Sequence, residues 1–465
     1  MIILKYMTKK IFALFLLGTF IITSGFGCKT TDSKTKKAME PITINYWRVF
    51  DGPDDFQDII KEYQKLHPFV TINYRKLRYA EYENELINAL AEDRGPDIFS
   101  IHNTWIKKYQ NKIAPLPAEI TMAYPVVTGS IKKEVINQLQ TNKSLTAKDV
   151  RDRFVDVVGN DVILENNQIY GLPLSVDTLA MYYNRDLFNG AGIIEAPKYW
   201  NKTFQQNVKS LSKQDPKKEI IQSGVALGGS TNINRASDIL SVLMMQNGAV
   251  MLDNNTVQFN LIPNKPGFKE NNFNPGGDAL KFYTDFANPG KEVYSWNEKL
   301  PNSLEMFTSG NLAIYFGYSY DLPTIKADAP KLNFSVSKLP QIEGNPDVNF
   351  ANYWVETVSK KSKYINEAWD FIQFMTQEKQ VKSYLDKTKR PTAIRALVPE
   401  QRENPELGVF ADQVLTAKSW YRGLNPNIAE NAILEMIDAA VRDKDSGRLM
   451  EALNDGAAKV QQSIN

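Results

Sequence analysis

The sequence predicts an α/β protein made of two lobes, each a sheet flanked by helices. Three observations support this prediction. The 465 residues exceed one ordinary domain. Hydrophobic residues make up 43% of the chain, enough for a sizeable core. Near the N-terminus, segments in which every second residue is apolar, as in strands, take turns with segments whose apolar residues have helical spacing. This order is expected of a parallel sheet covered by helices.

The first residues have the order of an export signal. Lys9 and Lys10 precede an apolar run, residues 11–22, and small residues then lead to Cys28, the single cysteine of the chain. The run is shorter than the roughly 20 residues that a spanning helix needs. We therefore expect residues 1–27 to be a signal peptide, with an uncleaved membrane anchor as the alternative.

The segment Gly25-Phe26-Gly27-Cys28 resembles the bacterial lipoprotein signal, in which a small residue precedes the cysteine that receives lipid. This resemblance implies that Cys28 is lipidated and that the protein is exported and anchored to the outer face of the cell membrane. The polar residues 28–40 are then expected to form a flexible tether.

The next segments alternate between strand and helix periodicity. Strands are expected at 42–46, 70–74 and 97–101, with helices at 56–66 and 81–93 between them. In such a parallel sheet, ligands bind beyond the carboxyl ends of the strands. Those ends correspond here to residues 47–51, 78–79 and 102–105.

The rest of the chain is patterned less regularly. We expect residues 120–158 to be mainly helical, residues 233–248 to form a buried helix, and residues 264–277 to form a surface loop. The other expected elements are a Gly-Leu-Pro turn and a strand within 168–184, a helix end and a strand within 304–321, and helices at 368–375 and 433–441.

Composition argues against several classes of function. The chain has two histidines and one cysteine, too few for an ordinary zinc site, and no cofactor or metal site is expected. The net charge is +2 and no dense basic stripe is present, so nucleic acid is not an expected partner. Catalysis by a pair of carboxylates stays open, because carboxylates are plentiful.

Several segments, in their order along the chain, resemble the family 1 extracellular solute-binding proteins, the sugar-binding subunits of bacterial ABC importers. The segments are Ile42–Trp47, His67–Val70, Gly95-Pro96-Asp97-Ile98, Tyr170–Pro173 with Met181–Phe188, Phe307–Ile314, Ala368–Ile372 and Arg390-Pro391-Thr392. The resemblance implies a two-lobe, type II periplasmic-binding-protein-like fold with crossover hinge segments. It also implies capture of a small solute, with sugar as the expected class, and delivery to the permease subunits of an ABC importer, without catalysis.

By the same resemblance, the chain crosses between lobes near residues 175–178, 339–344 and 386–391. Lobe one would comprise residues 41–174 and 345–385, and lobe two residues 175–344 and 386–465.

Candidate ligand contacts follow from both arguments. Aromatic faces suit the C–H face of a sugar ring, and carboxylates and amides suit its hydroxyls. At the strand ends we expect contacts from Trp47, Asp51, Asn103 and Trp105. The resemblance adds Asp177, Tyr318, Ser319, Asn352, Tyr353 and Trp420. For Trp47 and Trp420, packing within the protein is the alternative.

Two other functions stay open at this point. One is an exported carbohydrate-active enzyme that uses paired carboxylates. The other is a surface lipoprotein that acts as an adhesin or a sensor.

Overall fold

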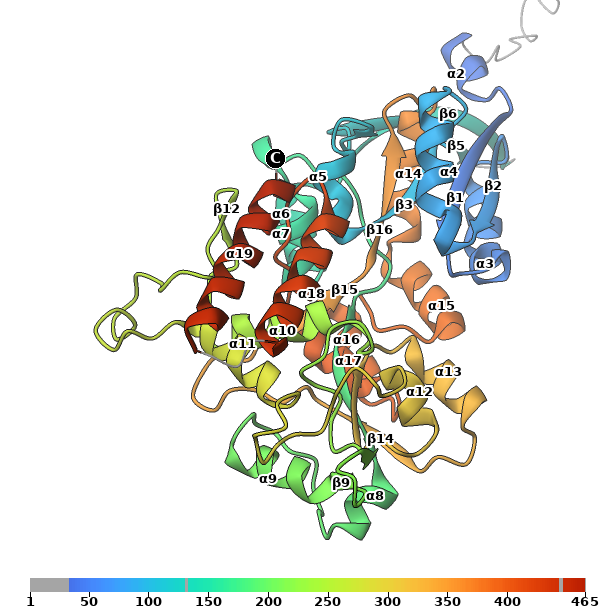
Figure 1. Cartoon of the computed structure of the whole chain (residues 1–465). Coiled ribbons are helices and arrows are strands. Elements are labelled where there is room, and N and C mark those ends of the chain that lie inside the picture. The colour runs from blue at the N-terminus through green and yellow to red at the C-terminus, as the bar shows by residue number, and fades with distance from the viewer. Residues whose placement is uncertain (1–32, 130–132, 443–445, 465) are drawn as a thin grey trace, which may run out of the picture.

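The computed structural model describes residues 33–129, 133–442 and 446–464 (Figure 1). Cys28, the signal residues 1–27 and the first part of the expected tether lie outside the described residues. Buried apolar side chains form two separate cores, one for each lobe. Among the described helices, none is long and apolar enough to span a membrane.

The sheet of lobe one has five strands in the order β2-β1-β3-β16-β4. The three expected strands are confirmed as β1 (Ile42–Val49), β2 (Val70–Leu77) and β3 (Ile98–His102), which run parallel. The sheet is completed by β16 (Trp354–Ser359), which is antiparallel to β3, and by β4 (Ile113–Ala114), which is antiparallel to β16. Strands from both ends of the sequence therefore share one sheet.

Helices cover both faces of this sheet. Both expected helices are confirmed as α3 (Pro53–Leu66) and α4 (Tyr79–Ala91). In α3 the buried residues Phe56, Ile59 and Tyr63 recur at helical spacing, and Pro53 starts the helix. The other elements of this layer are η1 (Asn103–Trp105), α5 (Ile106–Tyr109), α14 (Ile365–Met375) and α15 (Glu378–Thr388).

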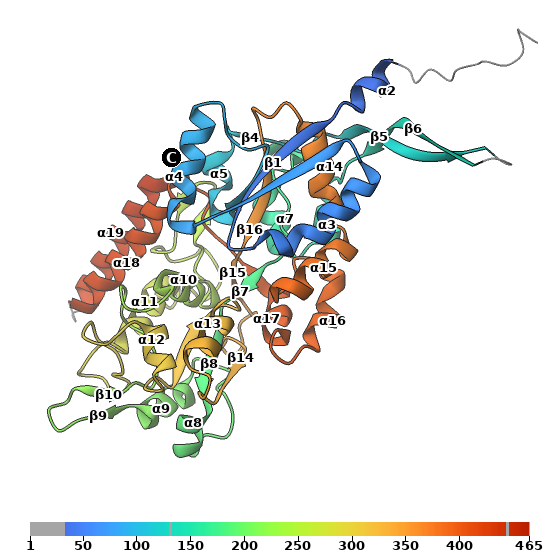
Figure 2. The same cartoon turned by 90° about the vertical axis from the view of Figure 1, so that its right-hand side faces the viewer.

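The prediction of a mainly helical segment at 120–158 is wrong for its first part. Residues there form a long hairpin of β5 (Glu119–Thr128) and β6 (Glu134–Lys143), which projects from lobe one (Figure 2). Ile120 and Met122 alternate toward the core, which is strand rather than helix spacing. Helices follow at α6 (Ala147–Arg153) and α7 (Asp156–Val162).

The segment expected to be a flexible tether contains a short helix, α2 (Ser33–Ala38). This helix packs against β5 and β6, and its Thr35 side chain is buried. The second half of the tether is therefore part of lobe one.

Lobe two is built around the antiparallel sheet β13-β8-β14, formed by Ile314–Gly317, Ala180–Asn184 and Phe334–Ser337. The expected buried helix is confirmed as α10 (Ala236–Gln246). The expected surface loop ends where α11 (Pro275–Asp285) begins. The other helices of lobe two are α8 (Arg185–Gly190), α9 (Lys202–Leu211), α12 (Ser303–Thr308), α13 (Asp321–Asp328), α18 (Pro426–Arg442) and α19 (Ser446–Ile464).

A small sheet joins the lobes. In it β15 (Asn349–Asn352) pairs with β7 (Asp177–Thr178) and with β17 (Ala417–Lys418). The remaining short elements are η2 (Glu165–Asn167), β9 (Lys213–Gln214), β10 (Ile220–Gln222), β11 (Leu252–Asp253), β12 (Thr256–Val257), η3 (Arg395–Leu397), α16 (Val398–Arg402), α17 (Gly408–Gln413) and η4 (Val414–Thr416).

The two cores suggest a revised lobe division. The chain leaves the first core after Val176 and returns to it at Ala351. It stays there through Val398, beyond the crossing expected at 386–391, because Ala393 and Ile394 are fully buried in lobe one. We propose that lobe one includes residues 386–398, and that residues 407–421 pack alternately on both cores.

The expected Gly-Leu-Pro turn is instead an extended segment that pairs with β16. The Leu172 amide donates to the Glu356 carbonyl at 3.1 Å, and the Glu356 amide returns a bond of 3.0 Å. A Cβ atom on Gly171 would lie 2.3 Å from Val355 Cγ1. The close approach of the two backbones therefore requires glycine here.

Gly171→Ala should lower the free energy of unfolding by about 1–3 kcal/mol, because the added methyl overpacks this contact. Urea unfolding of both proteins measures the change. Gly190→Ala is the control, because a Cβ there meets nothing within 4 Å. Equal stability of the two variants would contradict the packing argument.

Candidate functional site

A cleft of about 580 Å³ lies between the two lobes. Its lobe-one wall comes from the carboxyl ends of β1 and β3 and from the start of β16, and its lobe-two wall comes mainly from α10 and α18. The aromatic lining residues are Phe50, Tyr79, Trp105, Tyr320, Phe350, Tyr353, Trp354, Trp420 and Tyr421. The charged ones are Arg48, Asp51, Asp177, Arg235, Asp238, Arg390 and Glu430.

Trp354 is the centre of an aromatic wall in lobe one. Its ring centroid lies 5.5 Å from that of Trp105 and 5.9 Å from that of His102. Phe50 and Tyr79 contact it from the mouth of the cleft, at 5.7 and 6.1 Å. The wall offers ring faces and edges to a ligand rather than one isolated ring.

Phe50 and Tyr79 form the exposed rim of this wall. Their rings stack at 5.6 Å and are 46% and 58% exposed. Phe50 has a φ of 65°, a left-handed conformation that is unusual for a bulky residue. Such strain persists where surrounding structure enforces it and is concentrated at functional sites.

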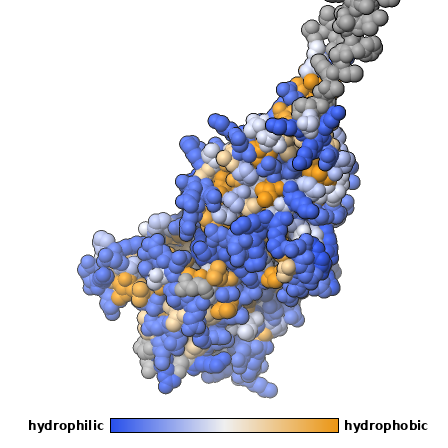
Figure 3. Space-filling view, turned by 90° about the horizontal axis from the view of Figure 1, so that it is seen from above, coloured by the Kyte–Doolittle hydropathy of each residue, from blue (hydrophilic) through white to orange (hydrophobic). Residues whose placement is uncertain are grey.

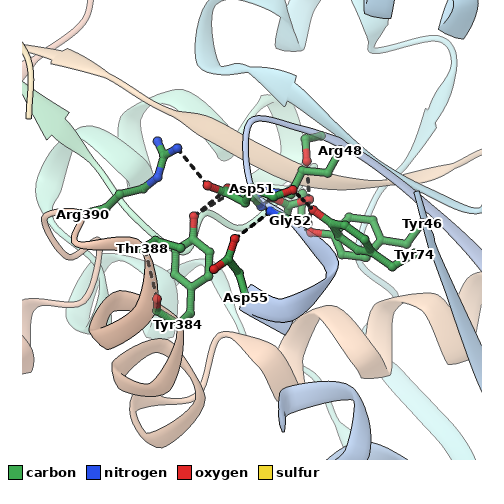
Figure 4. A network of polar contacts seen from close by, with 11 residues as sticks. Tyr46, Arg48, Asp51, Gly52, Asp55, Tyr74, Tyr384, Thr388 and Arg390 are labelled. Carbon is green, nitrogen blue, oxygen red and sulfur yellow. Dashed lines mark hydrogen bonds and ion pairs between the residues drawn. The ribbon is translucent and has the colours of Figure 1, made fainter. Parts of the chain in front are cut away.

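A buried polar network lies beneath the cleft (Figure 4). The Arg48 guanidinium is paired with the carboxylates of Glu356 and Asp51, and all three side chains are at most 5% exposed. Arg48 Nε donates to Asp51 Oδ2 at 2.9 Å. Tyr46 donates to Glu356 Oε2 at 2.7 Å, which further satisfies that carboxylate.

Asp51 also connects this network to the final third of the chain. Its Oδ1 accepts from Arg390 at 2.8 Å, and its Oδ2 accepts from the Tyr384 hydroxyl at 2.9 Å (Figure 4). Burial opposes ionisation of Asp51, but Arg48 and Arg390 outweigh it and hold the pKa of this carboxyl below its usual range. Asp51 therefore lines the cleft as a paired carboxylate.

Asp177 holds the first crossover to lobe two. Its Oδ2 accepts from the Ser319 hydroxyl at 2.7 Å and from the Ser319 amide at 3.0 Å. The Thr178 amide donates to Oδ1 at 2.8 Å. Burial nevertheless raises the pKa of Asp177 to about 6.

The lobe-two wall carries a second group of paired charges. Arg235 donates to both oxygens of Asp238, at 2.8 and 2.9 Å, and lies 3.2 Å from Glu430. The Tyr318 hydroxyl donates to Asp238 Oδ2 at 2.7 Å from below the surface. Arg235 has a φ of 58°, so each wall contains a left-handed, non-glycine residue.

His102, the last residue of β3, belongs to the lobe-one wall. Its Nε2 is 3.2 Å from Asn352 Oδ1, and its Nδ1 is 2.7 Å from Thr104 Oγ1. Burial lowers the pKa of His102 to about 4, and Arg235 contributes to this effect. The ring is therefore neutral at physiological pH and orients the Asn352 amide.

Asp161 organises the floor near the last crossover. This buried carboxylate accepts from Asn103 Nδ2 at 2.9 Å, from the Tyr353 hydroxyl at 2.7 Å and from the Ser419 hydroxyl at 2.6 Å. Arg422 pairs with it as well. The segment that carries Trp420 into the cleft is thereby fixed to lobe one.

The structure brings six of the ten expected ligand contacts to the cleft: Asp51, Trp105, Asp177, Asn352, Tyr353 and Trp420. Trp47, Asn103, Tyr318 and Ser319 do not line it. Alternation along β1 turns Trp47 outward, where the Arg75 guanidinium lies 4.8 Å from its ring. The other three are at most 3% exposed and support Asp161, Asp238 and Asp177 from behind.

Other lining residues did not emerge from the sequence. Phe50 and Tyr79 lie at the predicted strand ends, so their position was a signal that could have identified them. Arg235 and Asp238 belong to the segment 233–248 that was predicted as a buried helix, and Glu430 precedes the helix predicted at 433–441. Their sequence carries no comparable signal. Within the described residues, no group of three histidine, cysteine or acidic side chains could hold a metal ion.

Comparison with known proteins places this geometry in context. A profile of the bacterial extracellular solute-binding protein family matches residues 51–382. The chain is 21% identical to the galactooligosaccharide-binding protein of Bacillus subtilis (strain 168) over 447 residues, covering 95% of this chain and 94% of that one.

Solved structures show the same fold. A cyclo/maltodextrin-binding protein complexed with maltotetraose matches with a TM-score of 0.68 and 16% identity, covering 92% of this chain and 98% of that one. A cyclic α-maltosyl-1,6-maltose binding protein from Arthrobacter globiformis matches with a TM-score of 0.70 and 17% identity, covering 91% and 99%. The expected two-lobe, type II fold is thereby confirmed.

The raised pKa of Asp177 predicts a pH-dependent effect of Asp177→Asn. Between the unfolded value of 3.8 and the folded value of about 6, the folded state holds a proton that the unfolded state releases. The contribution of Asp177 to stability is therefore lost as pH rises through this window. The free energy of unfolding of the variant, relative to that of the native protein, should therefore rise by on the order of 1–2 kcal/mol between pH 5 and pH 7.5.

Chemical unfolding of both proteins at the two pH values measures this gain. The native chain provides the reference at each pH. A constant difference between the two proteins would show that Asp177 has the same pKa in both states.

Proposed function

The chain belongs to the bacterial extracellular solute-binding protein family, and from this premise we propose that it binds an oligosaccharide between its lobes and delivers it to an ABC importer. The motifs that resembled this family in the sequence agree with the family match. The relatives named above bind galactooligosaccharide and maltodextrins by their names, which supports sugar as the solute.

The observation that carries this proposal is the pairing of an aromatic wall with oriented polar groups on the opposite wall. Trp354, Tyr79 and Phe50 offer apolar ring surface on lobe one. Across the cleft, Asp238 and Glu430 offer carboxylate oxygens held in place by Arg235. A sugar has both an apolar C–H face and a ring of hydroxyls, and this arrangement suits both.

The cavity volume of about 580 Å³ supports a ligand larger than an ion or a single small metabolite. It falls within the range of roughly 300–1,000 Å³ that small-molecule sites occupy. The residues of both lobes would contact such a ligand together.

We also propose that the cleft binds without catalysis. The proteins it resembles are binding proteins. Its carboxylates Asp51, Asp177 and Asp238 each accept hydrogen bonds from several protein groups, which suits fixed acceptors of sugar hydroxyls. The sugar should therefore be recovered unchanged after long incubation.

We propose further that Cys28 is the lipidated N-terminus of the exported protein. The order of charged, apolar and small residues before it supports this assignment. The short polar segment between Cys28 and α2 would then connect the lipid to lobe one.

Titration with galactooligosaccharides and maltooligosaccharides tests the sugar proposal. At least one should bind, measured by calorimetry, and should raise the melting temperature by mass action. Tyr79→Ala and Trp354→Ala should each weaken binding by about 1–3 kcal/mol, taking aromatic stacking on nucleobases as a rough guide.

Tyr199→Ala is the matched control, since Tyr199 is an exposed tyrosine outside the cleft lining. Unchanged sugar affinity in both cleft variants would show that the aromatic wall takes no part in sugar recognition. Failure of the whole panel to bind would remove the sugar proposal itself.

Cys28→Ala should release the exported protein from the membrane into the soluble fraction, because the lipid attachment site is lost. Fractionation of cells and immunoblotting measure this release. Thr31→Ala, three residues further on, should leave the protein in the membrane fraction. A Cys28→Ala protein that stays membrane-bound would show that the apolar segment itself is the anchor.

A further inference from the structure

We propose that one end of lobe one, which carries exposed lysines, rests on the anionic headgroups of the membrane to which the protein is attached. We call this end the lysine pole and define it by Lys34, Lys36, Lys37, Lys360 and Lys363. The inference rests on the proposed export and lipid attachment at Cys28, and it is independent of which sugar the cleft binds.

The sheet of lobe one brings these lysines to the same edge. The strands β1, β2 and β3 begin at this edge, and the antiparallel β16 ends there. Helix α2 lies just before β1, and Lys360 directly follows β16. Only β3 separates β1 from β16, so the two strands lie about 10 Å apart, and Ser359 at the end of β16 is level with Asn45, three residues after the start of β1.

Local contacts hold the two lysine segments in place. The Lys360 amide donates to the Lys112 carbonyl at 2.8 Å, beside the pairing of Ser359 with Ile113. Helix α2 packs on the hairpin β5–β6, which fixes the direction of its lysines. Both segments lie at the end of lobe one from which the chain continues toward Cys28 (Figures 1 and 2).

The charge of the lysine pole is not neutralised by the protein. All five lysines are exposed, and none forms an ion pair with another described residue. Nearby acids are occupied otherwise: Asp93 pairs with Lys361, Glu92 pairs with Arg94, and Asp97 accepts from the Asn45 amide at 2.9 Å. In the sequence, Asp32 and Glu40 flank α2, two acids against the five lysines of the pole, so the positive charge prevails.

The position of Cys28 places this charge next to the membrane. Four residues separate Cys28 from Ser33, the first residue of α2. A fully extended chain of this length spans no more than about 18 Å. Since electrostatic attraction to anionic headgroups falls off within about 8 Å at physiological salt, the tether allows the lysines to enter this range.

The chemistry of the pole fits a charged surface better than a hydrophobic one. Viewed from above, the visible face of the molecule is largely hydrophilic, with hydrophobic residues scattered between the hydrophilic ones (Figure 3). Lysines on flexible stems bind phosphate groups as point charges and need no defined partner geometry. The expected contact is therefore weak, reversible and sensitive to salt.

Vesicle sedimentation tests this contact without any lipid on the protein. The chain from residue 28 onward, carrying Cys28→Ser, is mixed with vesicles of phosphatidylcholine or of equal parts phosphatidylglycerol and phosphatidylcholine. It should sediment with the anionic vesicles only. Salt at 1 M, where screening acts within about 3 Å, should release it.

The variant Lys36→Glu, Lys37→Glu, Lys360→Glu, Lys363→Glu should bind the anionic vesicles on the order of tenfold or more weakly. The matched control is Lys213→Glu, Lys217→Glu, Lys218→Glu, Lys331→Glu, which makes the same charge change on exposed lysines of lobe two. Strand β9, which begins with Lys213, lies at the opposite end of the molecule from α2 (Figures 1 and 2). The control should bind as the unmodified chain does.

Equal weakening in both variants would show that net charge alone acts and would overturn the lysine pole. Failure of the unmodified chain to bind anionic vesicles would also overturn the proposal. Unchanged melting temperatures in both variants confirm that they are folded. The Cys28→Ala fractionation reports on lipid attachment separately, so failure of the two proposals can be told apart.

Discussion

The buried guanidinium of Arg48 is the constraint on which the cleft depends. Arginine keeps its charge inside a protein, so each donor needs an acceptor. The acceptors of Arg48 are Tyr46 in β1, Asp51 just after β1, Glu356 in β16 and Tyr384 in α15. Removing one partner of such a buried pair costs about 3–5 kcal/mol, because the other charge is left uncompensated. Segments from both ends of lobe one are therefore held in one arrangement.

This arrangement extends from the interior to the ligand-facing surface. Asp51 accepts from Arg48 within the network and from Arg390 in the segment after α15. On the opposite wall, Arg235 is held between Asp238 and Glu430. Both walls thus present charges that already have partners inside the protein. A neutral, hydroxyl-rich ligand can bond to such groups without bringing a compensating charge of its own, which agrees with the proposed sugar.

Much of lobe one could be predicted from the sequence, because its elements have clear periodicities. The strands that begin with Ile42, Val70 and Ile98, and the two helices between them, follow periods of two and 3.6 residues. The hairpin at 119–143 could not be predicted in this way. Its outer strand is mostly exposed and polar, so no apolar alternation marks it.

The site was predicted less completely, for a different reason. Strand ends identify a region, which is why Asp51 and Trp105 were predicted and do line the cleft, but they do not fix which way a side chain points. Trp47 and Arg48 are neighbours, and a single step of alternation turns the tryptophan away from the cleft and the arginine toward it. Arg235 directly precedes α10 and Asp238 lies in its first turn. The apolar residues of this helix indicate burial, and only the tertiary fold shows that its first turn meets the cleft.

The polarity of the parallel sheet places the proposed ligand cleft and the proposed lipid attachment at different ends of lobe one. The carboxyl ends of β1 and β3 lead to Phe50 and His102, in the cleft. The opposite ends of the same strands lie beside α2, where the chain continues toward Cys28. A parallel strand of this length separates its two ends by about 25 Å. The sheet therefore separates the cleft from the end at which we propose membrane attachment, while one set of strands supports both.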